Sequence, residues 1–425
     1  MANDSPQYDL VVFGATGFVG TLLCQYLIDT ASKGDGFKWA IAGRSLTKLD
    51  QLATRLGPNA AHLPRWVANV TDEATLKALC AQTRVVISTV GPYALYGEPL
   101  VKVCAETGTD YCDLTGEAQW IRRMVAAYGD SAQRSGARIV HCCGFDSIPS
   151  DLGVYYLQQQ AQRQLGQPCT RVKMRVKGAQ GGLSGGTAAS GINLVKEATA
   201  NPALRSELAN PYSLCPDGHP AKHHPPTLVP VQYDAVFQEW VTPFVMAEIN
   251  TRIVLRSNAL LADAYGVDFQ YDEAILTGGG VTGWLVAQAL NLGLTSFAMA
   301  AAFAPTRWLL ENTVVPAPGE GPSPESQAQG FYDLRFWGET AEGQTIEVKV
   351  TGDRDPGYGS TAKILGQAGL CLAQDCPKSS QAGGFWTPAA MFGEGLVDRL
   401  VTDAGLSFEV LRGCSRGCSQ SSKDD

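Results

Sequence analysis

The chain has 425 residues, too many for one ordinary hydrophobic core, so we expect two domains. Hydrophobic residues make up 45% of the chain and charged residues 17%, a globular composition that excludes a disordered or fibrous protein. The net charge of −8 gives no electrostatic footprint for nucleic acid, so we expect no nucleic-acid partner.

The N-terminus and the cysteine pattern indicate where the protein resides. The opening sequence MANDSPQYDL has no basic segment followed by an apolar run, so we expect no signal peptide. Several of the twelve cysteines lie inside apolar, periodic segments, as free thiols do in a reducing, cytoplasmic setting. No Cys-x-x-Cys pair occurs and the five histidines are scattered, so we expect no metal site.

The first 145 residues alternate short apolar strands with helical periodicity. The expected strands are residues 9–13, 39–42, 65–68, 85–90, 111–113 and 138–141, and the expected helices are residues 20–28, 46–56, 72–80, 99–107 and 118–135. Strands that recur with helices between them predict a doubly wound parallel sheet of α/β class, a Rossmann domain over residues 1–145.

A glycine-rich turn connects the first expected strand to the first expected helix. Gly14 permits the tight turn, Gly17 lets the backbone approach a pyrophosphate, and Gly20 lets the helix pack on the strand. The amides at the start of the helix and its positive dipole end would bind the phosphates. We therefore expect the whole turn to bind a dinucleotide, namely Gly14, Ala15, Thr16, Gly17, Phe18, Val19 and Gly20.

The end of the second expected strand indicates which dinucleotide is bound. NAD enzymes place Asp or Glu there to hold the ribose 2′-hydroxyl, whereas this chain has Arg44 and Ser45, with Lys48 one helical turn later. Arg44 would pair with a 2′-phosphate and stack on adenine, and Ser45 would add a hydrogen bond. The sequence therefore predicts NADP(H); the plainer interpretation is that Arg44 is a solvated loop residue.

Further residues follow later strands at the same edge of the sheet. Thr89, Val90 and Gly91 come after the fourth strand, where Gly91 would permit backbone approach to the ribose or nicotinamide. Tyr93 would then lie over the reacting centre, although a tyrosine in such a crevice is more often a packing residue. Asn69 follows the third strand and is expected beside adenine, and Asp72 is either another neighbour of adenine or a charge at the start of a helix.

Beyond the Rossmann pattern, we expect a mixed α+β substrate domain over residues 146–380. Residues 171–177 alternate like a half-exposed strand, and residues 331–337 and 345–350 predict a hairpin. Residues 201–231 are typical of a loop. We expect a C-terminal helix within residues 381–412 that packs back on the Rossmann domain, followed by a polar tail at 413–425.

Residues 274–306 contain no Asp, Glu, Lys, Arg or His. A membrane span needs about 20 predominantly apolar residues, so the segment is long enough, but five glycines and several polar residues interrupt it. A buried helix or a contact between subunits of a homo-oligomer is the first interpretation. A helix at a membrane or lipid-droplet surface and a true span are the alternatives.

Eight motifs together resemble the saccharopine dehydrogenase-like oxidoreductases, in the branch of the trans-acting enoyl reductases and the lipid-droplet saccharopine dehydrogenase-like proteins. They are residues 14–20, 42–45, 89–93, 96–97, 111–117, 143–153, 185–190 and 383–390. The resemblance implies a Rossmann domain partly completed by residues near 386–401, with an inserted α+β domain. It also implies reduction of a double bond in a lipid intermediate, which feeds glycolipid assembly.

We therefore expect an NADPH-dependent reductase that acts on a small lipid or acyl substrate. Tyr93 and the backbone amides near Gly185 and Gly186 are candidate donors to an enolate oxygen, and Asp146 is a candidate base. The sequence 145–149 is also typical of a capped turn into a helix, so no catalytic residue is assigned. A saccharopine-type dehydrogenase with an amino-acid or imine substrate and a non-catalytic, lipid-associated NADP-binding protein remain the alternatives.

Overall fold

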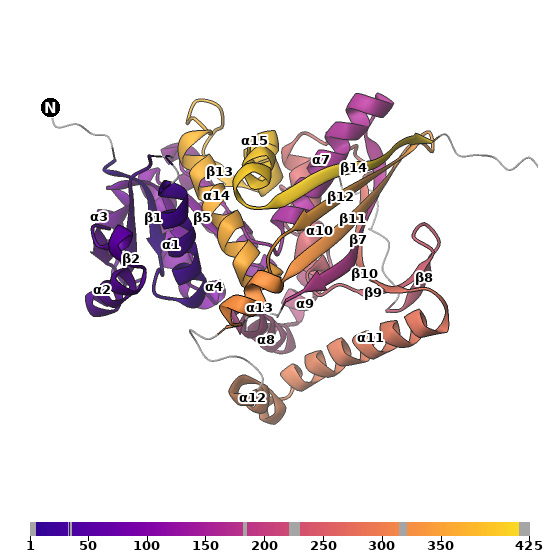
Figure 1. Cartoon of the computed structure of the whole chain (residues 1–425), viewed down its shortest axis with the longest axis horizontal. Helices are drawn as coiled ribbons and strands as arrows, with labels where there is room; N and C mark the ends of the chain where they lie inside the picture. Colours follow the sequence, from indigo (N-terminus) through magenta and orange to yellow (C-terminus); the bar gives the residue numbers. More distant parts are fainter. Residues whose placement is uncertain are drawn as a thin grey trace, which may run out of the picture.

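The computed structural model describes residues 6–32, 34, 36–181, 185–220, 230–313 and 321–415. Two seven-stranded sheets form two domains, and helices from the C-terminal part of the chain lie between them (Figure 1). The first sheet is parallel and the second is mixed, which confirms the expected fold class.

The first sheet has the strand order β13-β6-β5-β4-β1-β2-β3, in which every pair is parallel. Its strands are β1 (Tyr8–Phe13), β2 (Trp39–Gly43), β3 (Arg65–Val67), β4 (Thr83–Ser88), β5 (Asp110–Asp113), β6 (Arg138–Val140) and β13 (Gly384–Trp386). The near-continuous apolar run of β4 follows from this arrangement, because a central parallel strand is covered on both faces.

Helices cover both faces of this sheet. Leu10 and Val12 of β1 pack in one apolar core, whereas Val11 and Phe13 point into the other. The first core is closed by α1 (Phe18–Ala31) and α14 (Thr361–Gln374), and the second by α3 (Glu73–Cys80), α5 (Glu98–Thr107) and α6 (Ala118–Ser135). Smaller elements complete the domain: α2 (Leu46–Arg55), η1 (Pro58–Ala60) and α4 (Tyr93–Tyr96).

After the second domain the chain returns to the first sheet, and the returning segment begins earlier in the chain than expected. Strand β13 pairs with β6, and α14 packs directly on β1, β4 and β5, although its residues were assigned to the substrate domain. The helix α15 (Pro388–Asp403) packs on α14 but also on α7 (Ile148–Leu165) of the second domain. The resemblance implied a return by residues near 386–401, but no sequence pattern indicated that α14 also covers the sheet, because this contact joins residues more than 220 positions apart.

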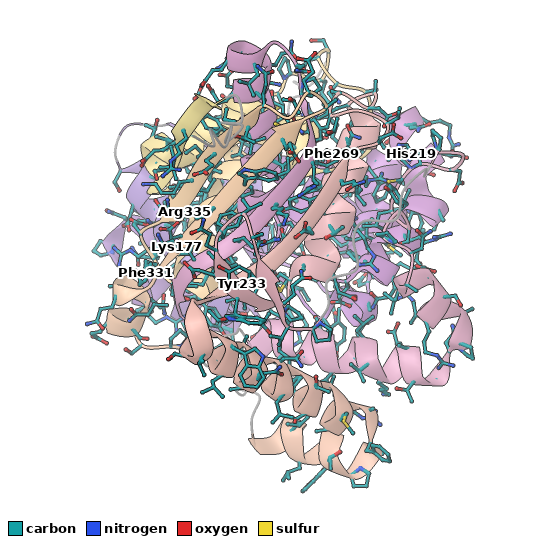
Figure 2. All side chains as sticks on the ribbon, turned by 90° about the vertical axis from the view of Figure 1, so that its right-hand side faces the viewer. Lys177, His219, Tyr233, Phe269, Phe331 and Arg335 are labelled. Carbon is teal, nitrogen blue, oxygen red and sulfur yellow. The ribbon has the colours of Figure 1, made fainter. Side chains whose placement is uncertain are left out.

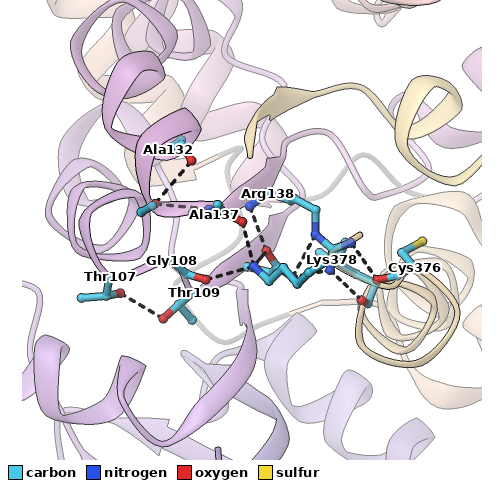
Figure 3. A network of polar contacts seen from close by, with 12 residues as sticks. Thr107, Gly108, Thr109, Ala132, Ala137, Arg138, Cys376 and Lys378 are labelled. Atoms are coloured by element: carbon cyan, nitrogen blue, oxygen red, sulfur yellow. Dashed lines mark hydrogen bonds and ion pairs between the residues drawn. The ribbon is translucent and has the colours of Figure 1, made fainter. Parts of the chain in front are cut away.

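A buried ion pair fastens the returning segment to the sheet (Figure 3). Arg138 of β6 donates to Asp110 of β5 at 2.5 and 3.1 Å, and both side chains are almost fully buried. Arg138 also donates to the carbonyl of Cys376, and Lys378 donates to Asp110 at 2.5 Å. The residues that follow α14 are therefore held at the amino-terminal edge of the sheet.

The second sheet has the order β14-β12-β11-β7-β10-β9-β8, with only β10 and β7 parallel. The expected hairpin is confirmed, because β11 and β12 pair antiparallel. The strands are β7 (Cys169–Gln180), β8 (Gln232–Asp234), β9 (Glu239–Pro243), β10 (Gln270–Gly278), β11 (Phe331–Thr340), β12 (Thr345–Gly352) and β14 (Leu406–Ser415). Strand β14 runs into the expected polar tail, of which residues 416–425 lie outside the described ranges.

Helices cover one face of the second sheet. The helices α7, α15 and α10 (Ala247–Leu260) lie on the inner face, toward the first domain. Figure 2 shows the other face of this sheet, on which the side chains of Lys177, Tyr233, Phe331 and Arg335 are fully or partly exposed to solvent. This half-covered sheet explains the alternation of buried and exposed residues along β11 and β12.

Several helices lie outside these layers. The expected loop 201–231 contains the helix α9 (Pro202–Leu208) after α8 (Gly185–Ala200), and residues 221–229 of it are not described. The apolar segment 274–306 contains the last residues of β10, all of α11 (Gly280–Ala302) and the start of α12 (Ala304–Thr313). Only 11% of the apolar part of α11 is buried, so the interpretation of 274–306 as a buried helix is wrong. The remaining elements are α13 (Pro324–Gln329) and η2 (Pro356–Ser360).

Candidate cofactor site

The glycine turn between β1 and α1 is closely packed at two of its three glycines. Gly14 has a φ of +88°, and a Cβ there would lie 2.6 Å from Cγ2 of Val90. A Cβ on Gly20 would overlap the carbonyl oxygen of Gly14, so only glycine lets α1 pack against the turn. These positions fit the roles expected of Gly14 and Gly20.

The start of α1 is open for an anion. Gly17 occupies the N-cap position, and no side chain caps the helix there. The first turn of α1 contains no acidic residue. The amides of Phe18, Val19 and Gly20 are therefore available for a phosphate, because the first amides of a helix have no partner within it. Ala15 and Thr16 form the bend of the turn before this helix.

The end of β2 presents positive charge to the same side. Arg44 and Lys48 are exposed, and neither side chain has an ion-pair partner among the residues that the structure describes. Ser45 caps α2, since its side chain accepts a hydrogen bond from the amide of Lys48 at 3.4 Å. The cap fixes the loop that carries Arg44 and leaves the guanidinium free for a 2′-phosphate.

The segment after β4 lies directly against the glycine turn. Thr89 donates from its hydroxyl to the carbonyl of Gly14 at 3.1 Å, and Val90 packs on the same glycine. A Cβ on Gly91 would lie 3.4 Å from the ring of Tyr93, an ordinary contact. The structure thus brings these predicted residues together with the turn.

The third strand contributes less. Asn69 is exposed, and its side chain accepts from the amide of Thr71 at 3.3 Å. Asp72 caps α3 by accepting from the amides of Ala74 and Thr75, which favours its role as a helix-start charge. The contact of Asn69 with adenine stays a prediction.

Tyr93 does not have the position expected of a catalytic donor. Its ring is buried, with 4% of its surface exposed, and its hydroxyl donates to the carbonyl of Ser88 at 2.9 Å. Burial raises the pKa of Tyr93 well above its ordinary value. The expectation that Tyr93 lies over the reacting centre is therefore wrong. The ring packs against Trp120 at a centroid distance of 5.5 Å and is a packing residue.

Glu117, whose role the local sequence pattern does not indicate, fixes this region. Its carboxylate accepts from the amides of Tyr93 and Ala94 at 2.7 and 3.0 Å, and from the hydroxyl of Ser190 at 2.9 Å. It thereby caps α4 and joins the first domain to α8 of the second. The signal in the sequence was that Glu117 belongs to the motif 111–117. Its partner Tyr93 lies 24 residues earlier in the chain, too far for a local pattern to reveal the contact.

Asp146 lies at the carboxyl edge of the sheet, six residues beyond the end of β6. It is half-buried, and no hydrogen bond to its carboxylate is found within the described part of the chain. Burial raises the pKa of Asp146 to about 6. A carboxyl group with this pKa exchanges protons near neutral pH, which suits an acid or base.

The turn that carries Asp146 is held from both sides. Ser147 occupies the N-cap position of α7 without a capping hydrogen bond, and instead donates to Asn250 of α10 at 2.9 Å. The amide of Phe145 donates to the hydroxyl of Thr361, at the start of α14. The sequence 145–149 is therefore a turn into a helix, as one interpretation expected, but tertiary contacts hold it rather than a serine cap.

A pair of aromatic rings lies at the start of α1. Phe18 at the start of α1 meets Tyr358 edge to face, with ring centroids 4.7 Å apart. The hydroxyl of Tyr358 accepts from the amide of Gly185, so this amide is not available as an oxyanion donor. Asp355 positions Tyr358 by accepting from its amide at 3.0 Å. The sequence Asp-Pro-Gly at 355–357 is typical of a turn, but it does not show where in the fold that turn lies.

A cavity of about 430 Å³ lies at the opposite, amino-terminal edge of the first sheet. Arg138, Asp110 and Lys378 line it, and these charges already pair with one another. The glycine turn, Arg44 and Asp146 all lie at the carboxyl edge instead, where ligands bind in such sheets. We therefore place the candidate site at the carboxyl edge.

Comparisons with known proteins identify the family of this chain. Residues 10–140 match the family described as the saccharopine dehydrogenase NADP binding domain. A Mycobacterium tuberculosis protein provisionally named a trans-acting enoyl reductase is 40% identical over 416 residues, which cover 96% of this chain and 98% of the relative. The Mycobacterium leprae trans-acting enoyl reductase is 36% identical over 432 residues, 97% of this chain and 100% of the relative.

The fold is also similar to that of a solved structure. Saccharopine dehydrogenase (L-Glu forming) from Saccharomyces cerevisiae matches with a TM-score of 0.53, covering 95% of this chain and 100% of that chain. The sequence identity is 15%, so this likeness concerns the fold alone.

Proposed function

Because the chain belongs to the saccharopine dehydrogenase-like family that includes the trans-acting enoyl reductases, we propose that it reduces a carbon–carbon double bond of a lipid or acyl intermediate with NADPH. The observation that carries the proposal is the match to relatives of that name over nearly their whole length. The open start of α1 and the unpaired Arg44 support the choice of cofactor.

The residues at the carboxyl edge would each bind a different part of the cofactor. The turn 14–20 would hold the pyrophosphate, Arg44 and Ser45 the 2′-phosphate, and the segment 89–91 the nicotinamide end. When bound, NADPH supplies a hydride to the β-carbon of the double bond. Asp146 would deliver the proton that the α-carbon needs, because its raised pKa keeps it partly protonated near neutral pH.

The alternative of an amino-acid substrate receives less support. Such a substrate needs cationic side chains for its carboxylates, and the buried arginines of the described ranges all have partners already. Arg138 pairs with Asp110, and Arg175 pairs with both Asp234 and Asp272. Arg252 and Arg256 donate to backbone carbonyls.

The test is the consumption of NADPH by the purified protein. We would follow the absorbance of NADPH with an α,β-unsaturated acyl thioester, with the saturated thioester as control, and with a cyclic imine in a parallel reaction. Oxidation with the unsaturated thioester, together with deuterium transfer from 4-deuterated NADPH to its β-carbon, is the expected result. Oxidation with the imine alone would favour the saccharopine type, and NADPH binding without oxidation of any substrate would favour a non-catalytic protein.

A further inference from the structure

The helices α11 and α12 form an apolar hairpin along the lower side of the molecule (Figure 1). We use the name apolar hairpin for residues 280–310 of these two helices. Its exposed large side chains are Val281, Trp284, Leu285, Val286, Leu290, Leu292, Met299, Phe303, Trp308 and Leu309. Such a dense apolar surface on a soluble domain marks a place of interaction.

The packed side of α11 is narrow. Gly283 and Ala287 face the body of the protein, where α11 lies on β9, β10 and α8. The hydroxyl of Thr277 donates to the carbonyl of Gly283 at 2.9 Å, which fixes the start of the helix on β10. Because one side of α11 is packed along the domain, the helix lies flat against the body and is not placed to cross a membrane, although its length suffices.

The exposed side is too wide for a flat protein interface. Successive residues of a helix point about 100° apart, so the side chains of Trp284, Leu285 and Val286 together span about 200° around α11. All three are exposed. A second copy of the chain would cover one of these directions, whereas a fluid apolar phase surrounds them all.

The charge pattern also differs from that of a protein interface. From residue 280 to 306 the sequence contains no Asp, Glu, Lys, Arg or His, so the apolar surface has no charged rim along α11. The two tryptophans lie near the two ends of the hairpin, Trp284 in the first turns of α11 and Trp308 in α12. Tryptophan is the residue that prefers the boundary between lipid headgroups and acyl chains.

The hairpin is linked to the candidate site through α8. After α12 and the residues outside the described ranges, the backbone at Gly321 lies against the ring of Phe18, which belongs to the turn that we assign to the pyrophosphate. Ser190 of α8, the helix on which α11 packs, donates to Glu117 beside the same crevice. A surface held by the hairpin would therefore lie on the side of the molecule to which α8 connects the candidate site.

From this geometry we propose that the apolar hairpin inserts into one leaflet of a lipid bilayer and holds the protein at the membrane surface. Insertion is driven by burial of the uncharged side chains and does not require anionic lipid. The docking does not depend on the reaction proposed above, although it would place the crevice next to lipid substrates.

Flotation of the full-length protein with phosphatidylcholine vesicles tests the proposal. The native protein should float with the vesicles and should continue to do so at high salt, since no charged side chain of α11 takes part. The double substitution Leu285→Glu and Leu292→Glu should lower the partition coefficient at least about tenfold, because two charges must then enter the lipid. Brominated phosphatidylcholine should quench the fluorescence of the native protein, and less so after Trp284→Phe and Trp308→Phe.

Matched controls separate this result from unfolding and from self-association. Val267→Glu and Val401→Glu place the same charge on exposed valines outside the hairpin, and should leave flotation unchanged. NADPH affinity of each variant, measured without vesicles, reports on the fold and on the proposed cofactor independently. Equal flotation of the native and double-variant proteins would overturn the proposal. So would a native oligomer that fails to float and that the double substitution dissociates, because the hairpin would then bind a second copy.

Discussion

We expect Arg44 to decide the choice between the two nicotinamide cofactors. Its guanidinium is exposed at the end of β2 without an ion-pair partner in the described ranges, where a 2′-phosphate would lie. We expect Arg44→Asp to weaken NADPH binding by at least about tenfold, because a charge-assisted hydrogen bond is lost and a repulsive charge is added. NADH binding should change little. Titrations followed by nicotinamide fluorescence measure both affinities, with the exposed Arg134→Asp as control. Equal losses for both cofactors would contradict the assignment.

Asp146 gives the proposed reaction its pH dependence. Burial raises its pKa to about 6, so the proton that it would donate is present below this pH and is lost as the pH rises through it. The rate of reduction should therefore fall as the pH rises above about 6. We expect Asp146→Asn to lower the rate roughly 100-fold and to remove this titration, while NADPH affinity stays unchanged. The pH profiles of both proteins measure this, and an unaltered profile in the variant would exclude Asp146 as the donor.

Single residues show how far the sequence analysis could reach. The packing roles of Gly14 and Gly20 were identified because they depend on a local turn whose geometry the pattern itself determines. The expectation that Tyr93 lies over the reacting centre was wrong, because its hydroxyl is held by the carbonyl of Ser88 and its ring by Trp120 in another helix. Local spacing does not contain such information.

At the scale of elements, three segments meet around a buried carboxyl group. Glu273 of β10 accepts from the hydroxyl of Tyr271 at 2.5 Å and from the amide group of Asn250 at 3.0 Å, and Asn250 of α10 also donates to Ser150 of α7. Burial raises the pKa of Glu273 to about 7. The folded protein therefore keeps this proton at pH values where the unfolded chain has already lost it.

The raised pKa of Glu273 makes the free energy of unfolding depend on pH in a defined direction. The contribution of Glu273 is fully present below pH 4.5, its ordinary pKa, and is lost as the pH rises through about 7. Relative to the native protein, Glu273→Gln should therefore gain up to roughly 3 kcal/mol in free energy of unfolding between acid pH and pH values above 7. Urea unfolding across this pH range measures the difference. The exposed Glu342→Gln is the matched control, and a difference that does not change with pH would contradict the prediction.

Elements with local signals were predicted well, and elements defined by distant partners were not. The strands of the first 145 residues and the hairpin of β11 and β12 agree with their periodicity. By contrast, α14 is apolar on a wide face and gives no sign that this face covers β1 and β4. The sequence also left the surroundings of α11 open, because an apolar sequence is equally compatible with a core and with a lipid surface.

For the whole molecule, the first domain is built from two distant parts of the chain. Residues 6–147 supply six strands, while α14 and β13 come from residues 361–386. Without α14, apolar side chains of β1 and β4 such as Leu10, Val12 and Ile87 would lose the cover of one face of the sheet. The buried pair of Arg138 and Asp110 would also lose the carbonyl of Cys376. The first domain should therefore depend on the returning segment for its stability.

The two parts are close enough in space to be joined directly. The amide of Phe145 donates to the hydroxyl of Thr361 at 3.1 Å, so a short Gly/Ser linker from residue 147 to residue 356 would bridge them. We expect this linked chain of residues 6–147 and 356–388 to unfold cooperatively and to bind NADPH. Residues 6–147 alone should do neither, because burial of the open face of the sheet contributes too much to folding. Urea unfolding and NADPH titration of both chains measure this. A cooperative, NADPH-binding fragment of residues 6–147 would show instead that the returning helix is dispensable for the first domain.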